Sequence, residues 1–159
     1  MRWVLLLTSL VLCFGVAFLG GQWTASEIPG WYRTLVRPSI APPNWIFAPV
    51  WTFLYLTMAI AAWMVTQSVP SSQRTIALLL FLLQLALNLA WSWIFFSQHA
   101  LGAALVEVVL MWIAVGATTA AFRPVAPWAA GLMLPYWAWV TFAAVLNAAF
   151  WRVNVVPRT

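Results

Sequence analysis

Five long apolar runs constrain this chain more than any other feature. Each is long enough to cross the hydrocarbon core of a bilayer, which takes about 20 residues at about 1.5 Å per residue. Because lipid leaves every backbone amide to be paired within its own segment, such runs form helices. The runs span residues 3–21, 44–66, 75–96, 100–122 and 128–151. The sequence therefore predicts an all-α membrane protein, a single bundle of five transmembrane helices forming one domain over residues 1–159.

The composition supports this fold class. Apolar residues make up 65% of the chain and charged residues 6%, whereas about a quarter of the residues in a soluble domain are charged. An alternative for the first run, a cleaved signal peptide, lacks a small-x-small cleavage site after the run. The short links at 67–74, 97–99 and 123–127 place sequential helices antiparallel in one bundle.

The charged residues argue against nucleic-acid binding. The net charge is +5, but the arginines stand singly at the ends of apolar runs, where they reach lipid headgroups. Three arginines fall at one membrane face and four at the other, a bias too small to assign the orientation: Arg2, Arg74 and Arg123 against Arg33, Arg37, Arg152 and Arg158. One cysteine, Cys13, and one histidine, His99, are too few for a metal cluster or an intrachain disulfide.

The link between the first two runs, residues 22–43, differs from the others. Its four prolines stiffen the backbone, and it carries Trp31, Tyr32, Arg33 and Arg37. Two interpretations remain open: a lid over a cavity at the mouth of the bundle, or an aromatic anchor on headgroups.

Three of the expected helices carry stripes of aromatic and polar residues. Amides that faced lipid would stay unpaired, so the stripes should point into the bundle. There they would either join helices by hydrogen bonds or line a cavity for a flat, hydrophobic ligand with a polar edge. The stripes are Trp51, Tyr55, Met58 and Ala62; Gln84, Asn88, Trp91 and Phe95; and Tyr136, Trp139, Ala143, Asn147 and Phe150.

The sequence shows no conventional catalytic site. Serine, histidine and acidic residues are not placed as a triad, and no glycine-rich phosphate loop is present. Glu107, about 10 Å into the fourth run, is either a functional acid or a structural carboxyl group bonded to another helix.

Several motifs, spread in order over nearly the whole chain, resemble a known family. They are Trp31-Tyr32-x4-Arg37-Pro38-x3-Pro42-Pro43-x-Trp45-x-Phe47-x-Pro49-x-Trp51-x3-Tyr55, then Gln84-x3-Asn88-x2-Trp91, then Pro135-Tyr136-x2-Trp139 and Leu146-Asn147-x3-Trp151-Arg152-x-Asn154. The chain is similar to the tryptophan-rich sensory protein and translocator protein family, TspO/TSPO, which includes the peripheral-type benzodiazepine receptor.

The resemblance implies a multi-pass membrane protein, commonly a homodimer, that binds porphyrins such as protoporphyrin IX and haem. It implies no obligatory cofactor and no metal site. Family roles include tetrapyrrole transport, sensing and regulation, light-dependent degradation of protoporphyrin IX, and binding or transport of sterols and other lipophiles. Because the sequence lacks an extended tail of the eukaryotic type, we expect the protein in a bacterial cell membrane rather than in the mitochondrial outer membrane.

The resemblance also implies a set of site residues. Trp51 and Trp139 correspond to the family's photochemical tryptophans. The sterol-recognition segment of animal members corresponds to Val145–Arg152, where Ala148 replaces the tyrosine, and Ser39 replaces a tryptophan common in relatives. The expected ligand-binding residues are Trp31, Tyr32, Trp45, Trp51, Tyr55, Asn88, Trp91, Trp139, Ala143 and Asn147.

A small-xxx-small pair, Ala86 and Ala90, lies on the third helix, which the family uses for its subunit contact. Such spacing lets two helix backbones approach closely. Gly116 and Ala120 form a competing pair on the fourth helix, and spacing alone does not choose between the two.

Overall fold

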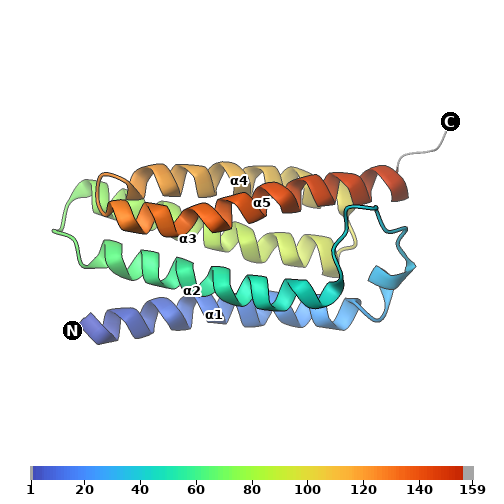
Figure 1. The fold of residues 1–159 in the computed structure, drawn as a ribbon, viewed down its shortest axis with the longest axis horizontal. Helices are drawn as coiled ribbons and strands as arrows, with labels where there is room; N and C mark the ends of the chain where they lie inside the picture. Colours follow the sequence, from blue (N-terminus) through green and yellow to red (C-terminus); the bar gives the residue numbers. More distant parts are fainter. Residues whose placement is uncertain (1, 156–159) are drawn as a thin grey trace.

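The computed structural model describes residues 2–155, in which every regular element is helical (Figure 1). Each of the five long helices is long and apolar enough to cross a membrane, which confirms the predicted five-helix membrane fold. The helices are α1 (Arg2–Glu27), α2 (Phe47–Thr66), α3 (Ser72–Ser92), α4 (Leu101–Phe122) and α5 (Pro127–Asn154).

The five helices pack as one elongated bundle. The N-terminus of α1, the α2–α3 link and the α4–α5 turn lie at one end, and the α1–α2 loop and the α3–α4 turn lie at the other (Figure 1). Helix α4 packs mainly against α3 and α5, and α1 packs mainly against α2. Local signals start two of these helices. At the start of α3, the Ser71 side chain accepts a hydrogen bond from the backbone N–H of Arg74. Pro127 occupies the first turn of α5.

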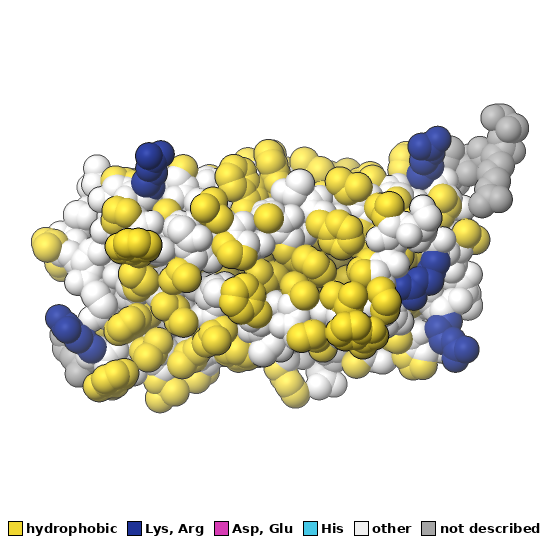
Figure 2. Space-filling model, viewed as in Figure 1, with side chains coloured by type: hydrophobic (Ala, Val, Ile, Leu, Met, Phe, Trp, Pro, Cys, Tyr) yellow, Lys and Arg dark blue, Asp and Glu magenta, His cyan; other side chains and the backbone are white. Residues whose placement is uncertain are grey.

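The outer surface matches a protein embedded in lipid. Hydrophobic side chains cover the length of the bundle in Figure 2, and arginines appear only near its two ends on the face shown. Large apolar side chains such as Phe18, Leu79 and Ile113 are more than half exposed. Arg158 lies outside the described residues.

The helices differ from the apolar runs at their ends. Helix α1 continues to Glu27, beyond the end of the first run at residue 21, because hydropathy marks the part of a helix within lipid rather than the whole helix. The loop that follows contains two 3-10 turns, η1 (Trp31–Thr34) and η2 (Asn44–Ile46). At the same end of the bundle, α3 continues into a π-helical turn, η3 (Trp93–Ser97).

Candidate functional site

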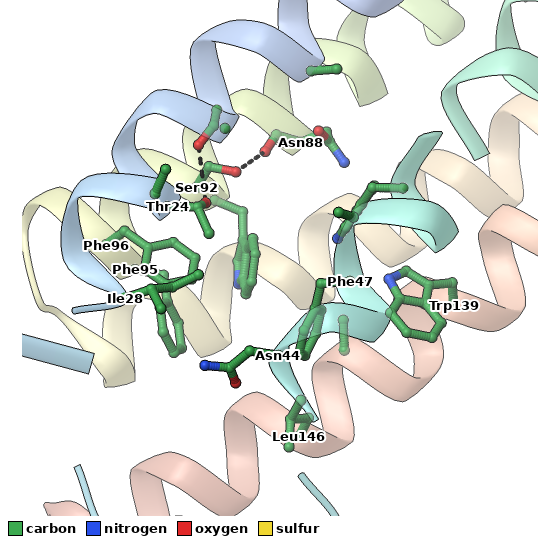
Figure 3. Close-up of a pocket in the computed structure, with 18 of the residues that line it drawn as sticks. Thr24, Ile28, Asn44, Phe47, Asn88, Ser92, Phe95, Phe96, Trp139 and Leu146 are labelled. Atoms are coloured by element: carbon green, nitrogen blue, oxygen red, sulfur yellow. Dashed lines mark hydrogen bonds between the residues drawn. The ribbon is translucent and has the colours of Figure 1, made fainter. Parts of the chain in front are cut away.

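A cavity of about 410 Å³ lies at the loop end of the bundle. Its wall comes from α1, α2, α3 with η3, α5 and the α1–α2 loop, and no residue of α4 lines it. Figure 3 shows residues from these separate elements facing the same space, among them Phe47, Asn88 and Trp139. A cavity of this size is within the range of about 300 to 1,000 Å³ of small-molecule sites.

Aromatic side chains form much of the wall. The Trp51 ring centroid lies 5.6 Å from that of Tyr55, and the Trp139 ring meets Phe47 edge-on at 6.1 Å. On the α3 side, the Trp91 ring lies 5.2 Å from Phe95. Indole rings from α2, α3 and α5 therefore line one apolar space, and each ring is held by an aromatic neighbour.

Asn88 joins three helices at the base of this wall. The Tyr55 hydroxyl of α2 donates to Asn88 Oδ1 at 2.5 Å, and Asn88 Nδ2 donates to the Tyr136 hydroxyl of α5 at 3.1 Å. Asn88 also lines the cavity. Its amide is thus satisfied by protein partners at both ends, while its edge faces the cavity.

Asn147, nearer the loop, likewise bonds to other segments of the protein and lines the cavity. Trp91 Nε1 donates to Asn147 Oδ1 at 3.1 Å, and Asn147 Nδ2 donates to the carbonyl oxygen of Leu101 at 2.9 Å. The first bond holds the Trp91 indole in the cavity wall. The two interpretations left open by the sequence, helix joining and cavity lining, therefore apply to the same residues.

The α1–α2 loop covers the end of the cavity with Tyr32, which is 6% exposed and packs on Phe95, Phe96 and Phe150. Trp31 stacks instead on His99 of the α3–α4 turn, with ring centroids 4.1 Å apart. His99 Nε2 in turn lies 3.0 Å from Glu27 Oε2. This contact set ties the loop to the end of α1 and to the α3–α4 turn.

The structure brings most of the expected ligand-binding residues together. Trp31 and Trp45 do not line the cavity: Trp31 packs on His99, and Trp45 is 74% exposed because the η2 turn directs it away from the bundle. The expected residues that line the cavity are Tyr32, Trp51, Tyr55, Asn88, Trp91, Trp139, Ala143 and Asn147.

Two other polar groups from the sequence lie apart from the cavity. Gln84 is fully buried within the stripe on α3, and Glu107 is buried on α4. Neither the Gln84 amide nor the Glu107 carboxyl group forms a hydrogen bond with any residue in the described part of the chain. Neither lines the cavity.

The two small-residue pairs occupy different environments. Ala86 is exposed on the outer face of α3 and Ala90 is half-buried. Gly116 of α4 is covered by Trp137 of α5, so close that an added Cβ would lie 2.9 Å from the indole Cζ2 atom.

The α1 wall was missed by the sequence analysis. Helix α1 carries no polar stripe, yet Phe14, Ala17, Gly20, Gly21 and Thr24 line the cavity. Gly20 allows a close approach to α3, since a Cβ there would lie 3.0 Å from Ser92 Oγ. The available signal was the Gly20–Gly21 pair inside an apolar run, a composition typical of close helix packing.

Comparison with known proteins points to one family. A profile of the TspO/MBR family matches residues 9–152. The chain is 40% identical over 144 residues to "Tryptophan-rich protein TspO" of Chlorobaculum tepidum, covering 90% of this chain and 91% of the relative. It is 40% identical over 144 residues to "Translocator protein" of Bos taurus, covering 89% and 85%. It is 39% identical over 154 residues to "Tryptophan-rich sensory protein" of Cereibacter sphaeroides, covering 97% and 94%.

Proposed function

Because this chain belongs to the TspO/MBR family, we propose that it binds tetrapyrroles, protoporphyrin IX or haem, in the aromatic cavity and so contributes to their transport, sensing or regulation. The protein is an integral multi-pass membrane protein. The names of its relatives, translocator protein and tryptophan-rich sensory protein, support a role in moving or detecting a ligand.

The observation that carries this proposal is the convergence of Trp51, Trp91 and Trp139 on one apolar cavity. A flat macrocycle presents two apolar faces, which aromatic rings contact by offset stacking or edge-on packing. Because the amides of Asn88 and Asn147 are bonded to protein partners, the wall offers such a ligand few unpaired polar groups. The cavity therefore suits a planar hydrophobic ligand better than a polar metabolite.

Tryptophan quenching tests this proposal on purified protein in neutral detergent. Protoporphyrin IX is expected to quench the intrinsic fluorescence saturably, and Trp51→Ala combined with Trp139→Ala is expected to weaken the binding. Trp128→Ala is the control, since Trp128 is 81% exposed outside the cavity. Non-saturable quenching by porphyrin and haem, or saturation with a sterol alone, would contradict tetrapyrrole binding.

Light-dependent degradation of protoporphyrin IX is a second candidate, favoured by the position of Trp51 and Trp139 in the cavity wall. A photoexcited porphyrin can take an electron from an indole ring that it contacts, and the position of the ring governs how efficiently this occurs. Porphyrin absorbance should decay faster under illumination with wild-type protein than with the Trp51→Phe and Trp139→Phe double variant. Equal decay rates would argue against this activity.

We further propose that two copies pair through α3. The small residues Ala86 and Ala90 lie toward the outer surface, where they would let two backbones approach closely. Cross-linking in liposomes should yield a dimer that Ala86→Leu with Ala90→Leu removes. A dimer that persists in this double variant would place the contact elsewhere.

A further inference from the structure

The mouth of the cavity carries a positive charge that has no acidic partner among residues 2–155. Arg37 in the α1–α2 loop donates from Nη1 to Asn44 Oδ1 at 2.9 Å and from Nη2 to the carbonyl oxygen of Pro42 at 2.6 Å. Both acceptors are neutral. The chain has two acidic side chains: Glu27 pairs with His99, and Glu107 is buried in α4. Neither compensates the guanidinium.

This charge acts directly on the cavity wall. Asn44, whose oxygen accepts from Arg37, lines the cavity beside Phe47 (Figure 3). The bond from Arg37 fixes the carboxamide with its oxygen toward the guanidinium, which leaves Asn44 Nδ2 as a donor. Burial raises the pKa of the Tyr32 phenol, another lining group, and the positive charge of Arg37 opposes that shift. Arg37 therefore reaches the cavity wall through its hydrogen bond to Asn44.

We infer that Arg37, acting with Asn44, selects ligands that carry a carboxylate on one edge, so that an apolar macrocycle enters with its acidic edge at the loop. This inference rests on the proposed function. An apolar cavity with an uncompensated cation at its mouth matches an amphiphilic anion, because the apolar faces leave water while the carboxylate keeps a charged donor. The acidic side chains of protoporphyrin IX and haem have this chemistry, whereas a sterol has none.

A purely structural role for Arg37 makes a different prediction. Its two bonds also pin residues 37–44 together, so its removal could weaken all ligands by loosening the loop. Asn44→Asp separates the two roles. An aspartate still accepts the Arg37 bond and keeps the loop in place, but it cancels the charge that faces the ligand.

The test compares protoporphyrin IX with its dimethyl ester, which keeps the ring and loses both acids. Both are titrated by tryptophan quenching in a neutral detergent, and the ratio of the two dissociation constants is compared between variants, so that partitioning into micelles cancels. Arg37→Gln and Asn44→Asp should each weaken diacid binding about tenfold or more and leave ester binding within about twofold. Arg37→Lys should retain part of the preference, and salt should weaken only the diacid.

The controls isolate the position of the charge. Arg33→Gln removes an exposed arginine of the same loop, and Arg74→Gln removes one at the opposite end of the bundle; neither should change the ratio. An equal loss of diacid and ester in Arg37→Gln, or an unchanged ratio in Asn44→Asp, would overturn the inference while leaving tetrapyrrole binding intact. Saturable binding of neither probe by wild-type protein would instead overturn the proposed function.

Anionic lipid presents the same charge as a ligand carboxylate, so the titrations are repeated with phosphatidylglycerol in the micelles. The inference expects the diacid preference to survive this addition. Loss of the preference at low lipid content would assign Arg37 to headgroup binding and overturn the inference.

Discussion

Asn154 near the end of α5 forms a matched pair of hydrogen bonds with the backbone of Val36 in the α1–α2 loop. The Val36 amide donates to Asn154 Oδ1 at 2.8 Å, and Asn154 Nδ2 donates to the Val36 carbonyl oxygen at 3.0 Å. A single side chain thereby fixes the loop one residue before Arg37. The positions of Arg37 and Asn44 at the mouth of the cavity thus depend on a contact between two residues that are 118 positions apart in the sequence.

Asn154→Ala is expected to loosen the loop without unfolding the bundle. Each lost bond contributes about 0.5–1.5 kcal/mol, so the bound ligand should dissociate several-fold faster and trypsin should cut after Arg33 sooner. Stopped-flow quenching and timed proteolysis measure the two effects. Val155→Ala, at the exposed neighbouring residue, is the control. Unchanged rates in Asn154→Ala would mean that the loop is held elsewhere.

Asn88→Leu is expected to lower the free energy of unfolding by about 1–2 kcal/mol, since interhelical hydrogen bonds in membranes contribute up to roughly this much. The substitution leaves the buried hydroxyl groups of Tyr55 and Tyr136 without the Asn88 amide. Tyr136→Phe removes one of the two Asn88 bonds, together with the weak hydrogen bond from the Tyr136 hydroxyl to Met111 Sδ at 3.6 Å, and leaves no buried hydroxyl group unpaired at position 136, so it should cost less. Thermal unfolding in detergent gives both values, and the reverse order would contradict the bonding described for Asn88.

Gly116→Ala is expected to destabilise the protein by about 1–3 kcal/mol through overpacking. The added methyl group would lie 2.9 Å from Trp137 Cζ2, so the indole ring or α4 must shift. Gly131→Ala is the matched control because its Cβ would meet nothing within 4 Å. A lower melting temperature in Gly116→Ala alone is the expected result. Equal melting temperatures would show that Trp137 moves aside at no cost.

Ala143→Leu is expected to weaken porphyrin binding about tenfold, because overpacking of this kind costs about 1–3 kcal/mol. Ala143 lines the cavity, so a leucine side chain at this position would occupy space that the ligand needs. Ala138→Leu on the exposed face of α5 should leave binding unchanged. Saturable quenching provides the measurement, and equal affinities in the two variants would remove Ala143 from the site.

Much of the cavity could be predicted from the sequence because polar side chains in lipid have only one favourable direction. Asn88 and Asn147 point inward on that ground alone, and helical spacing carries Trp91 and Ala143 to the same side. Their partners could not be predicted. That Asn88 bonds Tyr55 and Tyr136 depends on how three helices rotate against one another.

The α1–α2 loop and α1 have features that local sequence patterns do not predict. Trp31 and Tyr32 are adjacent aromatic residues of the same motif, yet Tyr32 lines the cavity and Trp31 stacks on His99, because the η1 turn and the Glu27–His99 contact orient them differently. Apart from Phe14, helix α1 enters the wall through small residues, whose pattern does not predict which side of the helix faces the cavity. Ala86 and Gly116 each begin a small-xxx-small pair with the same spacing. Only the packing of the helices shows that Trp137 covers Gly116.

The amino-acid sequence by itself determined the five membrane-spanning helices, the inward direction of their amides and the family, because hydropathy, hydrogen-bonding demand and motif spacing are properties of each segment. The tertiary structure alone decided that Tyr32 and not Trp31 lines the cavity, how Asn154 holds the loop and where Arg37 places its charge. Those depend on contacts between segments far apart in the chain, and no local pattern encodes the rotation of one helix against another.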